Sequence, residues 1–433
     1  MNERAKHTLL LVLIALTTVP FFFLVHLPTW GLDLRSRQSI ALYLSAAFGY
    51  GGVSLLIWEL ILGTRAISGL YFKELASKLK LHRWLGTYGI LFIFLHPFLV
   101  LYNYGESLGY VFVPTIRSDF DLAVTYGRVA FIGLIIVWVT SAIVRGKIAY
   151  RPWKYIHYLS YPILLFSLLH VPSTGSSFPE RGIQFFWLSF CAIVLVCTTL
   201  RLAQFFGYGK VAYKIVENAR LAENIALVHL SPVGEVIEIR NGQYLYIQSR
   251  TFGEEHPFTV LDYGLPDGGI LIAFKIFGRF TEGLANLPVG DVLMLDGPYG
   301  TFTQERSLDP TLAAVYIAGG IGITPFVRQV LTSPGSDQYL FWANQSRDVM
   351  VFRDQLRQGL GARFIEVYSR ENLTGENLET GHINKQLLAK YLEEPSRFQY
   401  FICGPQGMMG ATKASLLELG VSESRIQTEE FGF

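Results

Sequence analysis

The hydrophobic pattern divides the chain into two halves near Phe206. The first half contains long apolar runs separated by short polar or basic stretches. Runs of about 20 apolar residues are long enough to cross a bilayer as helices. Six such runs predict spans at 7–28, 40–63, 83–102, 125–145, 155–171 and 183–206. Residues 1–206 are therefore expected to form an all-α six-helix transmembrane bundle.

After Gly207 the pattern changes to short alternating stretches. VAYKIV, IALVHL, EVIEIR, QYLYIQ, ILIAFKIF and DVLMLDGPYG are separated by Gly, Pro and Asn turns, which predicts an antiparallel β-barrel over residues 207–308. Over residues 309–433, predicted strands alternate with predicted helices, as in AAVYIAGGIGITPFVRQVL. This alternation predicts an α/β, Rossmann-like domain with a parallel sheet. The fold class is therefore multidomain.

Basic residues gather in alternate loops of the first half. Those between the second and third spans are Arg65, Lys73, Lys78, Lys80 and Arg83, and those between the fourth and fifth are Arg145, Lys147, Arg151 and Lys154. The positive-inside rule then places both termini and the soluble half in the cytoplasm, as in an integral protein of the cell membrane. The first loop, with Arg35 and Arg37, is an exception.

Overall charge and cysteine content narrow the function classes. The 433 residues carry a net charge of +2, which gives no reason to expect nucleic-acid binding. Three cysteines, Cys191, Cys197 and Cys403, form no metal-binding or disulfide pattern.

Four histidines lie inside or at the edges of the predicted spans. His82 and His96 stand in LHRWLGTYGILFIFLHP, and His157 and His170 in RPWKYIHYLSYPILLFSLLHVP. Ionisable side chains are rare inside membranes and are usually functional there. Fourteen helical residues span about 21 Å, so each helix offers one imidazole near each side of the bilayer core. The predicted topology makes both spans run in the same direction, which pairs His82 with His157 and His96 with His170.

Two such pairs predict axial ligands for two haems, because neutral imidazole is a common ligand of haem iron. A single histidine of this kind could instead be a hydrogen-bonded packing residue, but two matched pairs favour the metal role. The 13-residue gap of the second pair turns an ideal helix away from its starting face by roughly 140°. Pro162 lies in this gap and is expected to kink the helix and alter its phase.

A glycine-rich segment, AGGIGITPF (318–326), follows a predicted strand and opens a predicted helix. Its glycines would let the backbone approach a pyrophosphate at the helix N-terminus. The alternative is a tight turn without a ligand.

Five motifs occur in the order seen in the ferredoxin–NADP reductase superfamily. They are HPFTV (256–260), FKIFGRFTEGL (274–284), DGPYG (296–300), AGGIGITPF and FICGPQGMM (401–409). Joined to a six-span domain with paired histidines, the chain resembles the NADPH oxidase and ferric reductase family, in particular its compact prokaryotic-type oxidases. HRWLG, from His82, also resembles the third span of that family. The resemblance covers nearly the whole chain and implies FAD, two haem b groups and NADPH, or NADH, as cofactors.

The resemblance also implies site residues. His256, Pro257, Phe258 and Thr259 would line the flavin and ribityl chain of FAD, and Gly278, Phe280 and Thr281 its pyrophosphate. Gly320, Gly322, Thr324 and Pro325 would form the nicotinamide-nucleotide turn, and Cys403, Gly404 and Pro405 the strand end beside the nicotinamide.

Ser369 and Arg370 would hold the 2′-phosphate, since an arginine suits a phosphate, although the adjacent Glu371 leaves room for NADH. Phe433 would stack on the isoalloxazine ring where the nicotinamide must enter, so Phe433 and Cys403 are the catalytic candidates. Phe258 and Phe280 could instead be barrel core, and Phe433 a docked chain end.

The predicted activity is that of a transmembrane NAD(P)H oxidase. A hydride would pass from cytosolic NADPH to FAD, and electrons would then cross through two haems to dioxygen, giving superoxide. A ferric chelate is the alternative acceptor, and an electron-relay subunit for a partner protein is the alternative from another class. Dioxygen or another small acceptor and membrane lipid are the expected partners, with no obligatory protein partner.

Overall fold

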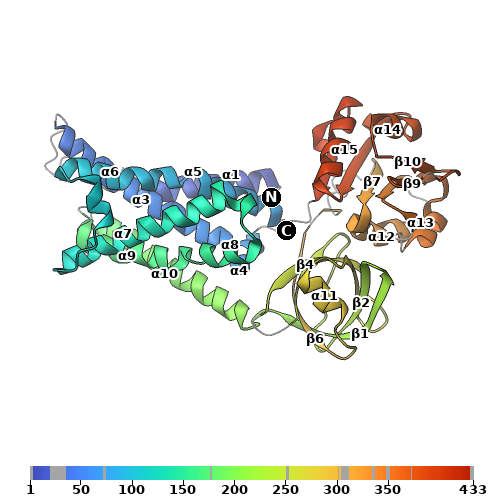
Figure 1. Cartoon of the computed structure of the whole chain (residues 1–433), viewed down its shortest axis with the longest axis horizontal. Coiled ribbons are helices and arrows are strands. Elements are labelled where there is room, and N and C mark those ends of the chain that lie inside the picture. The colour runs from blue at the N-terminus through green and yellow to red at the C-terminus, as the bar shows by residue number, and fades with distance from the viewer. Residues whose placement is uncertain are drawn as a thin grey trace. The chain divides into compact units, whose positions relative to one another are not determined.

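The computed structural model describes residues 3–19, 36–71, 75–175, 178–249, 253–300, 302–303, 312–333, 337–347, 352–371 and 373–429. The chain forms two compact units, Met1–Ala203 and Gln204–Phe433. The first unit is helical, and the second contains a barrel and an open sheet (Figure 1). The division near residue 204 agrees with the change in hydrophobic pattern, while the finer domain limits remain predictions.

The helical unit contains nine α-helices in the described residues. They are α1 Glu3–Thr18, α3 Arg37–Gly63, α4 Arg65–Tyr71, α5 Leu75–Tyr88, α6 Ile90–Tyr104, α7 Asp119–Trp138, α8 Tyr150–His157, α9 Ser160–Thr174 and α10 Arg181–Phe205. A π-helical turn, Val139–Ile143, continues α7. Ser36 and Ser118 cap α3 and α7 by accepting hydrogen bonds from Ser39 N and Asp121 N.

Four helical stretches are long and apolar enough to cross a membrane: Arg37–Gly63, Lys78–Tyr104, Asp119–Ile143 and Arg181–Phe205. The predicted first span begins within α1, whose apolar part is Thr8–Thr18, and its end lies outside the described residues. The predicted fifth span is divided into α8 and α9 by a turn at Tyr158 and Leu159. The apolar helical bundle is thus confirmed, and the count of six spans remains a prediction.

This turn explains the mismatched spacing of the second histidine pair. His157 ends α8 and His170 lies on α9, so the two side chains do not share one continuous helix. Pro162 is the third residue of α9, where a missing amide disrupts little of the helix. The change of phase therefore comes from the break before Pro162, and a kink within one helix is not needed.

Six antiparallel strands in the second unit close a barrel in the order β1–β2–β5–β4–β3–β6. They are β1 Val211–Ala222, β2 Ile225–Pro232, β3 Tyr244–Gln248, β4 Glu255–Tyr263, β5 Ile270–Lys275 and β6 Val292–Tyr299. A short helix, α11 Arg279–Ala285, follows β5. Tyr213, Ile247 and Leu293 are fully buried in the barrel core. The predicted antiparallel barrel is confirmed.

Two stretches of the barrel differ from the prediction. EVIEIR (235–240) forms no strand. Its amides bond to side chains instead, with Ile237 N donating to Tyr213 Oη (2.9 Å) and Arg240 N to Gln243 Oε1 (2.8 Å). The HPFTV motif lies on a strand, β4, despite its proline. β4 pairs with β5 only from Val260 onward, so Pro257 lies on a locally unpaired edge, where proline is tolerated.

The open sheet is wholly parallel, in the order β10–β9–β8–β7–β11–β12. Its strands are β7 Ala313–Gly319, β8 Gln338–Asn344, β9 Phe364–Tyr368, β10 Leu378–Thr380, β11 Phe398–Cys403 and β12 Ile426–Glu429. The helices are α12 Thr324–Leu331, α13 Arg353–Leu360, α14 Lys385–Tyr391 and α15 Gln406–Glu418. Alternate residues of β7 belong to two different hydrophobic clusters, Tyr316 to one that includes residues of α12 and Ile317 to one that includes residues of α14 and α15. This doubly covered sheet confirms the predicted Rossmann-like fold.

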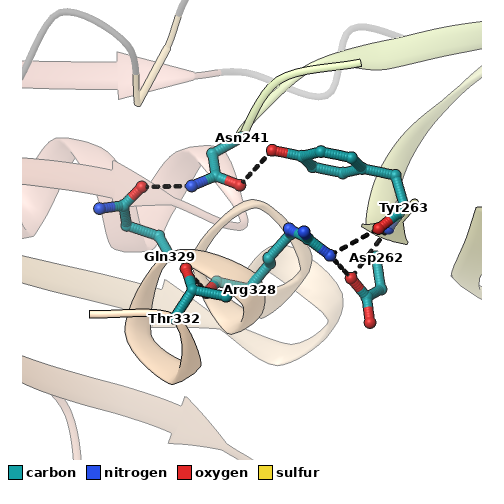
Figure 2. A network of polar contacts seen from close by, with 6 residues as sticks. All are labelled: Asn241, Asp262, Tyr263, Arg328, Gln329 and Thr332. Carbon is teal, nitrogen blue, oxygen red and sulfur yellow. Dashed lines mark hydrogen bonds and ion pairs between the residues drawn. The ribbon is translucent and has the colours of Figure 1, made fainter. Parts of the chain in front are cut away.

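A polar network joins the barrel to the first helix of the open sheet (Figure 2). Arg328 of α12 pairs with the carboxylate of Asp262, donates to Tyr263 O (2.7 Å), and lies 3.8 Å from the centroid of the Tyr263 ring. Tyr263 Oη donates to Asn241 Oδ1 (2.9 Å), and Asn241 Nδ2 donates to Gln329 Oε1 (2.7 Å). The network ties the end of β4, which carries HPFTV, to the helix that follows the glycine-rich turn.

Candidate functional site

Four histidines form two facing pairs within the helical unit. The ring centroids of His82 and His157 are 6.1 Å apart with an interplanar angle of 72°, and those of His96 and His170 are 6.3 Å apart at 82°. These are the two pairs that the topology predicts. Their role as metal ligands remains a prediction that the geometry supports.

The separations suit a metal ion between each pair of rings. Bonds of about 2 Å from one iron to two facing nitrogens, with about 1 Å from each nitrogen to its ring centroid, separate the centroids by roughly 6 Å. Edge-to-face packing of two rings gives similar centroid separations, so the distances agree with metal ligation and do not by themselves distinguish it from packing. The residues present therefore fit two haem irons, one in each pair.

The first pair lies near the C-terminal ends of α3 and α10. Gly63 ends α3, and a Cβ atom there would be 3.9 Å from His82 Cε1. Arg201 of α10 donates to Gly63 O (3.4 Å), and α10 ends at Phe205, one residue after the second unit begins at Gln204. We call His82 and His157 the exit-side pair, and His96 and His170 the far-side pair.

Each far-side histidine contacts a backbone carbonyl through Nδ1. His96 Nδ1 lies 2.7 Å from Ser45 O on α3, and His170 Nδ1 lies 2.9 Å from Ala123 O on α7. A carbonyl oxygen can only accept, so Nδ1 carries the proton in both rings. This tautomer leaves Nε2 unprotonated and able to bind a metal.

A glycine follows each of these carbonyls by one helical turn. A Cβ atom on Gly49 would lie 2.9 Å from His96 Nδ1, and one on Gly127 would lie 2.6 Å from His170 Nδ1. Both distances are too short for a real Cβ contact. The two glycines therefore let the imidazoles approach α3 and α7 closely enough to reach the carbonyls.

The exit-side histidines contact side chains instead. His82 Nδ1 lies 2.6 Å from Glu59 Oε2 on α3. His157 Nδ1 lies 3.3 Å from Ser141 Oγ, which also accepts a hydrogen bond from Trp153 Nε1 (3.1 Å). The Trp153 ring stacks on His157, with centroids 5.1 Å apart and an interplanar angle of 26°. As ligands, both histidines would be oriented by these partners.

A cavity of about 430 Å³ adjoins the far-side pair. Its lining is mostly apolar, but Arg128 of α7 contributes a buried guanidinium. Arg128 Nη1 donates to Thr115 Oγ1 (3.0 Å), and the guanidinium lies 4.1 Å from the Tyr110 ring centroid. Nε and Nη2 of Arg128 have no hydrogen-bond partner in the described part of the chain. The cavity volume falls in the range of cofactor sites.

In the barrel, the two FAD motifs implied by the resemblance lie side by side. The rings of His256 and Phe280 stack with centroids 4.0 Å apart at 28°. Gly278 precedes α11 at a φ of 83°, with open space where a Cβ would be, and Thr281 Oγ1 accepts from Phe277 N (2.7 Å). Phe258 belongs to the barrel core, as its alternative interpretation proposed.

Pro257 and Thr259 face β3, opposite Tyr246 and Tyr244 in the strand register. Thr259 is buried. Of the HPFTV residues, only His256 and Pro257 are partly exposed, so they are the ones able to meet a bound group.

The remaining nucleotide motifs meet at one edge of the parallel sheet. The strand order reverses between β7 and β11, and ligands of such sheets bind outside the carboxyl ends of the strands at this switch point. Gly320, Gly322, Thr324 and Pro325 follow β7, whereas Cys403, Gly404 and Pro405 end or follow β11. A Cβ atom on Gly322 would lie 2.4 Å from Cys403 O, so only glycine permits this close approach.

Cys403 is fully buried at the end of β11. Burial, and secondly the carboxylate of Glu429, raise the pKa of the Cys403 thiol well above its ordinary value. The side chain therefore stays a neutral thiol at physiological pH and is not a thiolate nucleophile.

Ser369 and Arg370 follow β9 and are exposed. Their amides donate to Asn344 O (3.0 Å) at the end of the neighbouring strand β8 and to Gln345 O (3.1 Å) just after it. Glu371 Oε2 accepts from Arg347 N (3.2 Å). Phe433 lies outside the described residues, so its stacking role remains a prediction.

Several site residues were not found from the sequence: Gly49, Glu59, Gly127, Arg128, Ser141 and Trp153. A single carboxyl in the apolar stretch 40–63 and a single guanidinium in the apolar stretch 125–144 are the sequence signals that point to Glu59 and Arg128. The partners of His157 could not be inferred, because spacing alone does not tell which helix faces meet.

Comparison with known families matches both parts of the chain. Residues 48–168 match the ferric reductase like transmembrane component, and residues 316–414 match the oxidoreductase NAD-binding domain. The first match contains His82, His96 and His157 and ends two residues before His170, and the second contains the glycine-rich turn, Arg370 and Cys403. The chain thus joins a stretch similar to a ferric reductase transmembrane component to one similar to an oxidoreductase NAD-binding domain.

Individual relatives match about half of the chain. The flavohemoprotein of Pseudomonas putida is 28% identical over 237 residues, which are 52% of this chain and 59% of that protein. NADH-cytochrome b5 reductase 1 of Lodderomyces elongisporus is 24% identical over 229 residues, covering 49% of this chain and 76% of that protein. The crystal structure of the flavohemoglobin of Malassezia yamatoensis has a TM-score of 0.49 at 19% identity, covering 75% of this chain and 91% of that one.

Proposed function

We propose that this chain, which has the architecture of the NADPH oxidase and ferric reductase family, carries electrons from NADPH across a membrane to dioxygen, giving superoxide. In this proposal the chain crosses the membrane six times and keeps both termini and the reductase unit in the cytoplasm. It needs no obligatory protein partner.

The observation that carries the proposal is the matched geometry of the two histidine pairs, with centroid separations of 6.1 Å and 6.3 Å. Two metal levels in one helical bundle provide a path across the membrane. A single haem, held by one histidine pair, would serve electron transfer on one side of the membrane only.

The proposal gives each cofactor a place in the described part of the chain. His82 with His157 and His96 with His170 would hold two haems, His256 and the turn at Gly278 would hold FAD, and Gly320 with Cys403 would flank the nicotinamide. When bound, FAD accepts a hydride and releases single electrons that haem iron can carry. The protein residues orient these groups, and the network around Arg328 keeps the flavin strand and the nucleotide helix together.

The far-side cavity is lined by His96 and His170, so it would hold the far-side haem, and its mostly apolar lining fits that group. Dioxygen is the proposed acceptor because a small apolar molecule can approach a haem in such surroundings more easily than a hydrated chelate can. The partly unsatisfied guanidinium of Arg128 favours the second candidate, an anionic ferric chelate, because it offers a buried positive charge.

Anaerobic reduction of the purified chain in detergent by NADPH tests the proposal. The haem spectrum should become that of ferrous haem, and admitted oxygen should reoxidise it with formation of superoxide. Reoxidation by ferric citrate but not by oxygen would establish the second candidate. A preparation without haem would contradict both.

Arg370 is the proposed contact to the 2′-phosphate of NADPH. Arg370→Ala should raise the Michaelis constant for NADPH about tenfold or more and barely change that for NADH, since one charge-assisted contact is worth roughly 1.5–3 kcal/mol. Arg363→Ala, which changes another exposed arginine before β9, is the matched control. Equal effects of Arg370→Ala on the two nucleotides would place Arg370 away from the phosphate.

A further inference from the structure

Glu59 is a carboxyl residue within a membrane-spanning helix, α3. Its side chain is 16% exposed, and Oε2 lies 2.6 Å from His82 Nδ1. The other oxygen, Oε1, is buried without a hydrogen-bond partner among the described residues. Carboxyl groups inside a membrane are costly and are retained where they have a function. Among the described residues, Oε2 therefore has a bonding partner, His82, and Oε1 has none.

The other three paired histidines have neutral partners. His96 and His170 contact the carbonyls of Ser45 and Ala123, and His157 contacts the hydroxyl of Ser141. Glu59 therefore makes His82 the one paired histidine in direct contact with an acidic side chain in the described part of the bundle. The asymmetry separates the exit-side pair from the far-side pair.

A carboxyl partner changes what an imidazole does as a ligand. It increases the basicity of the ring, so the ring donates more electron density to a metal and stabilises the more positive oxidation state. Hydrogen bonding of this kind is one of the levers by which proteins set haem potentials. A backbone carbonyl, as used on the far side, has a weaker effect because it carries no net charge.

We propose that Glu59 is a positioning residue that lowers the reduction potential of the exit-side haem below that of the far-side haem. Electron transfer from the reductase end toward the far side is then downhill. The inference rests on the proposed function, since it requires haem at both pairs. Lys78, one helical turn before His82, carries an opposing positive charge, but its Nζ donates to Ser68 Oγ (2.6 Å), whereas Glu59 contacts the ring directly.

Spectroelectrochemical titration of the haem-loaded full chain in detergent tests this proposal. The wild-type curve should contain two one-electron steps. Glu59→Gln keeps the shape of the side chain and removes its charge, so the lower step should move upward and the upper step should stay in place. We expect at least a tenfold increase in the ferrous-to-ferric ratio of the exit-side haem at a fixed potential, which equals about 59 mV for one electron.

Glu106→Gln is the matched control, because Glu106 is a carboxyl residue that lines the far-side cavity and is not in contact with a paired histidine ring. It should leave the lower step unchanged. Two haems with an unmoved lower step in Glu59→Gln would overturn the inference and leave the proposed function intact. A wild-type chain that binds fewer than two haems would instead contradict the proposed function.

If Glu59→Gln loses the exit-side haem, Glu59→Asp decides the question. Aspartate keeps the charge with one methylene fewer, so the haem should be retained with its potential still below that of the far-side haem. Equal potentials for the two haems in Glu59→Asp would overturn the inference.

Discussion

The two histidine pairs differ in what contacts their Nδ1 atoms. Side chains of Glu59 and Ser141 serve the exit-side pair, whereas backbone carbonyls of Ser45 and Ala123 serve the far-side pair. A backbone carbonyl is present whatever residue occupies the position. The far-side arrangement therefore depends less on the residues that supply the acceptors than on the glycines that let the rings come close.

Side-chain partners can vary in charge and backbone partners cannot. A substitution can therefore change the charge next to Nδ1 in the exit-side pair, and with it the electron density that the imidazole donates to a metal. In the far-side pair the group next to Nδ1 is a neutral carbonyl whatever the residue. The same difference predicts which substitutions disturb each pair.

The largest effect is expected from removal of a far-side ligand. His96→Ala should remove one haem and leave the other, because each proposed haem needs both imidazoles of its pair. The pyridine haemochrome assay should fall from two haems per chain to one. His382→Ala, which changes an exposed histidine of the reductase unit, is the control and should keep both haems. An unchanged count in His96→Ala would refute the ligand assignment.

A glycine substitution should distinguish the two pairs. Gly127→Ala places a Cβ atom 2.6 Å from His170 Nδ1, and Gly63→Ala places one 3.9 Å from His82 Cε1, an ordinary contact. Overpacking of this kind costs about 1–3 kcal/mol. Gly127→Ala should therefore weaken haem retention on the far side by roughly five- to a hundredfold, as measured by haem transfer to a scavenger apoprotein. Equal retention in the two variants would show that the glycine contact does not position His170.

The pairing of the histidines could be predicted because it needs only the direction of two spans. Loop charges set that direction, and the 14-residue spacing sets the two levels. The contact between Glu59 and His82 could not be predicted in the same way. It depends on which face of α3 meets α5, and an apolar helix without a strong polar face gives no such indication.

Helix breaks and edge effects account for the other differences. The sequence predicts a helix kink at Pro162, whereas the helix is broken three residues earlier, by the turn at Tyr158 and Leu159. EVIEIR has the alternation of a strand since Ile237 and Ile239 are buried, although its backbone bonds to side chains. HPFTV is not among the predicted strands, but it lies on β4, one side of which is unpaired at Pro257. In each case the side-chain pattern reports burial, and hydrogen bonding is decided by neighbours distant in sequence.

The smallest effect concerns the acceptors themselves. Ser141→Ala removes the Oγ atom that contacts His157 Nδ1 and accepts from Trp153 Nε1, leaving two part-buried ring nitrogens without this partner. Such a loss costs about 1–3 kcal/mol, part of which the stacked Trp153 ring offsets by still holding the imidazole in place. Ser45→Ala is the matched substitution on the far side. It removes a hydroxyl that donates to Leu42 O, while the carbonyl that serves His96 remains. Haem dissociation from the exit side should therefore become about tenfold faster in Ser141→Ala, and far-side dissociation should be unchanged in Ser45→Ala. Faster far-side loss in Ser45→Ala would mean that the side chain, and not the backbone, fixes His96, and the difference between the two pairs would no longer hold.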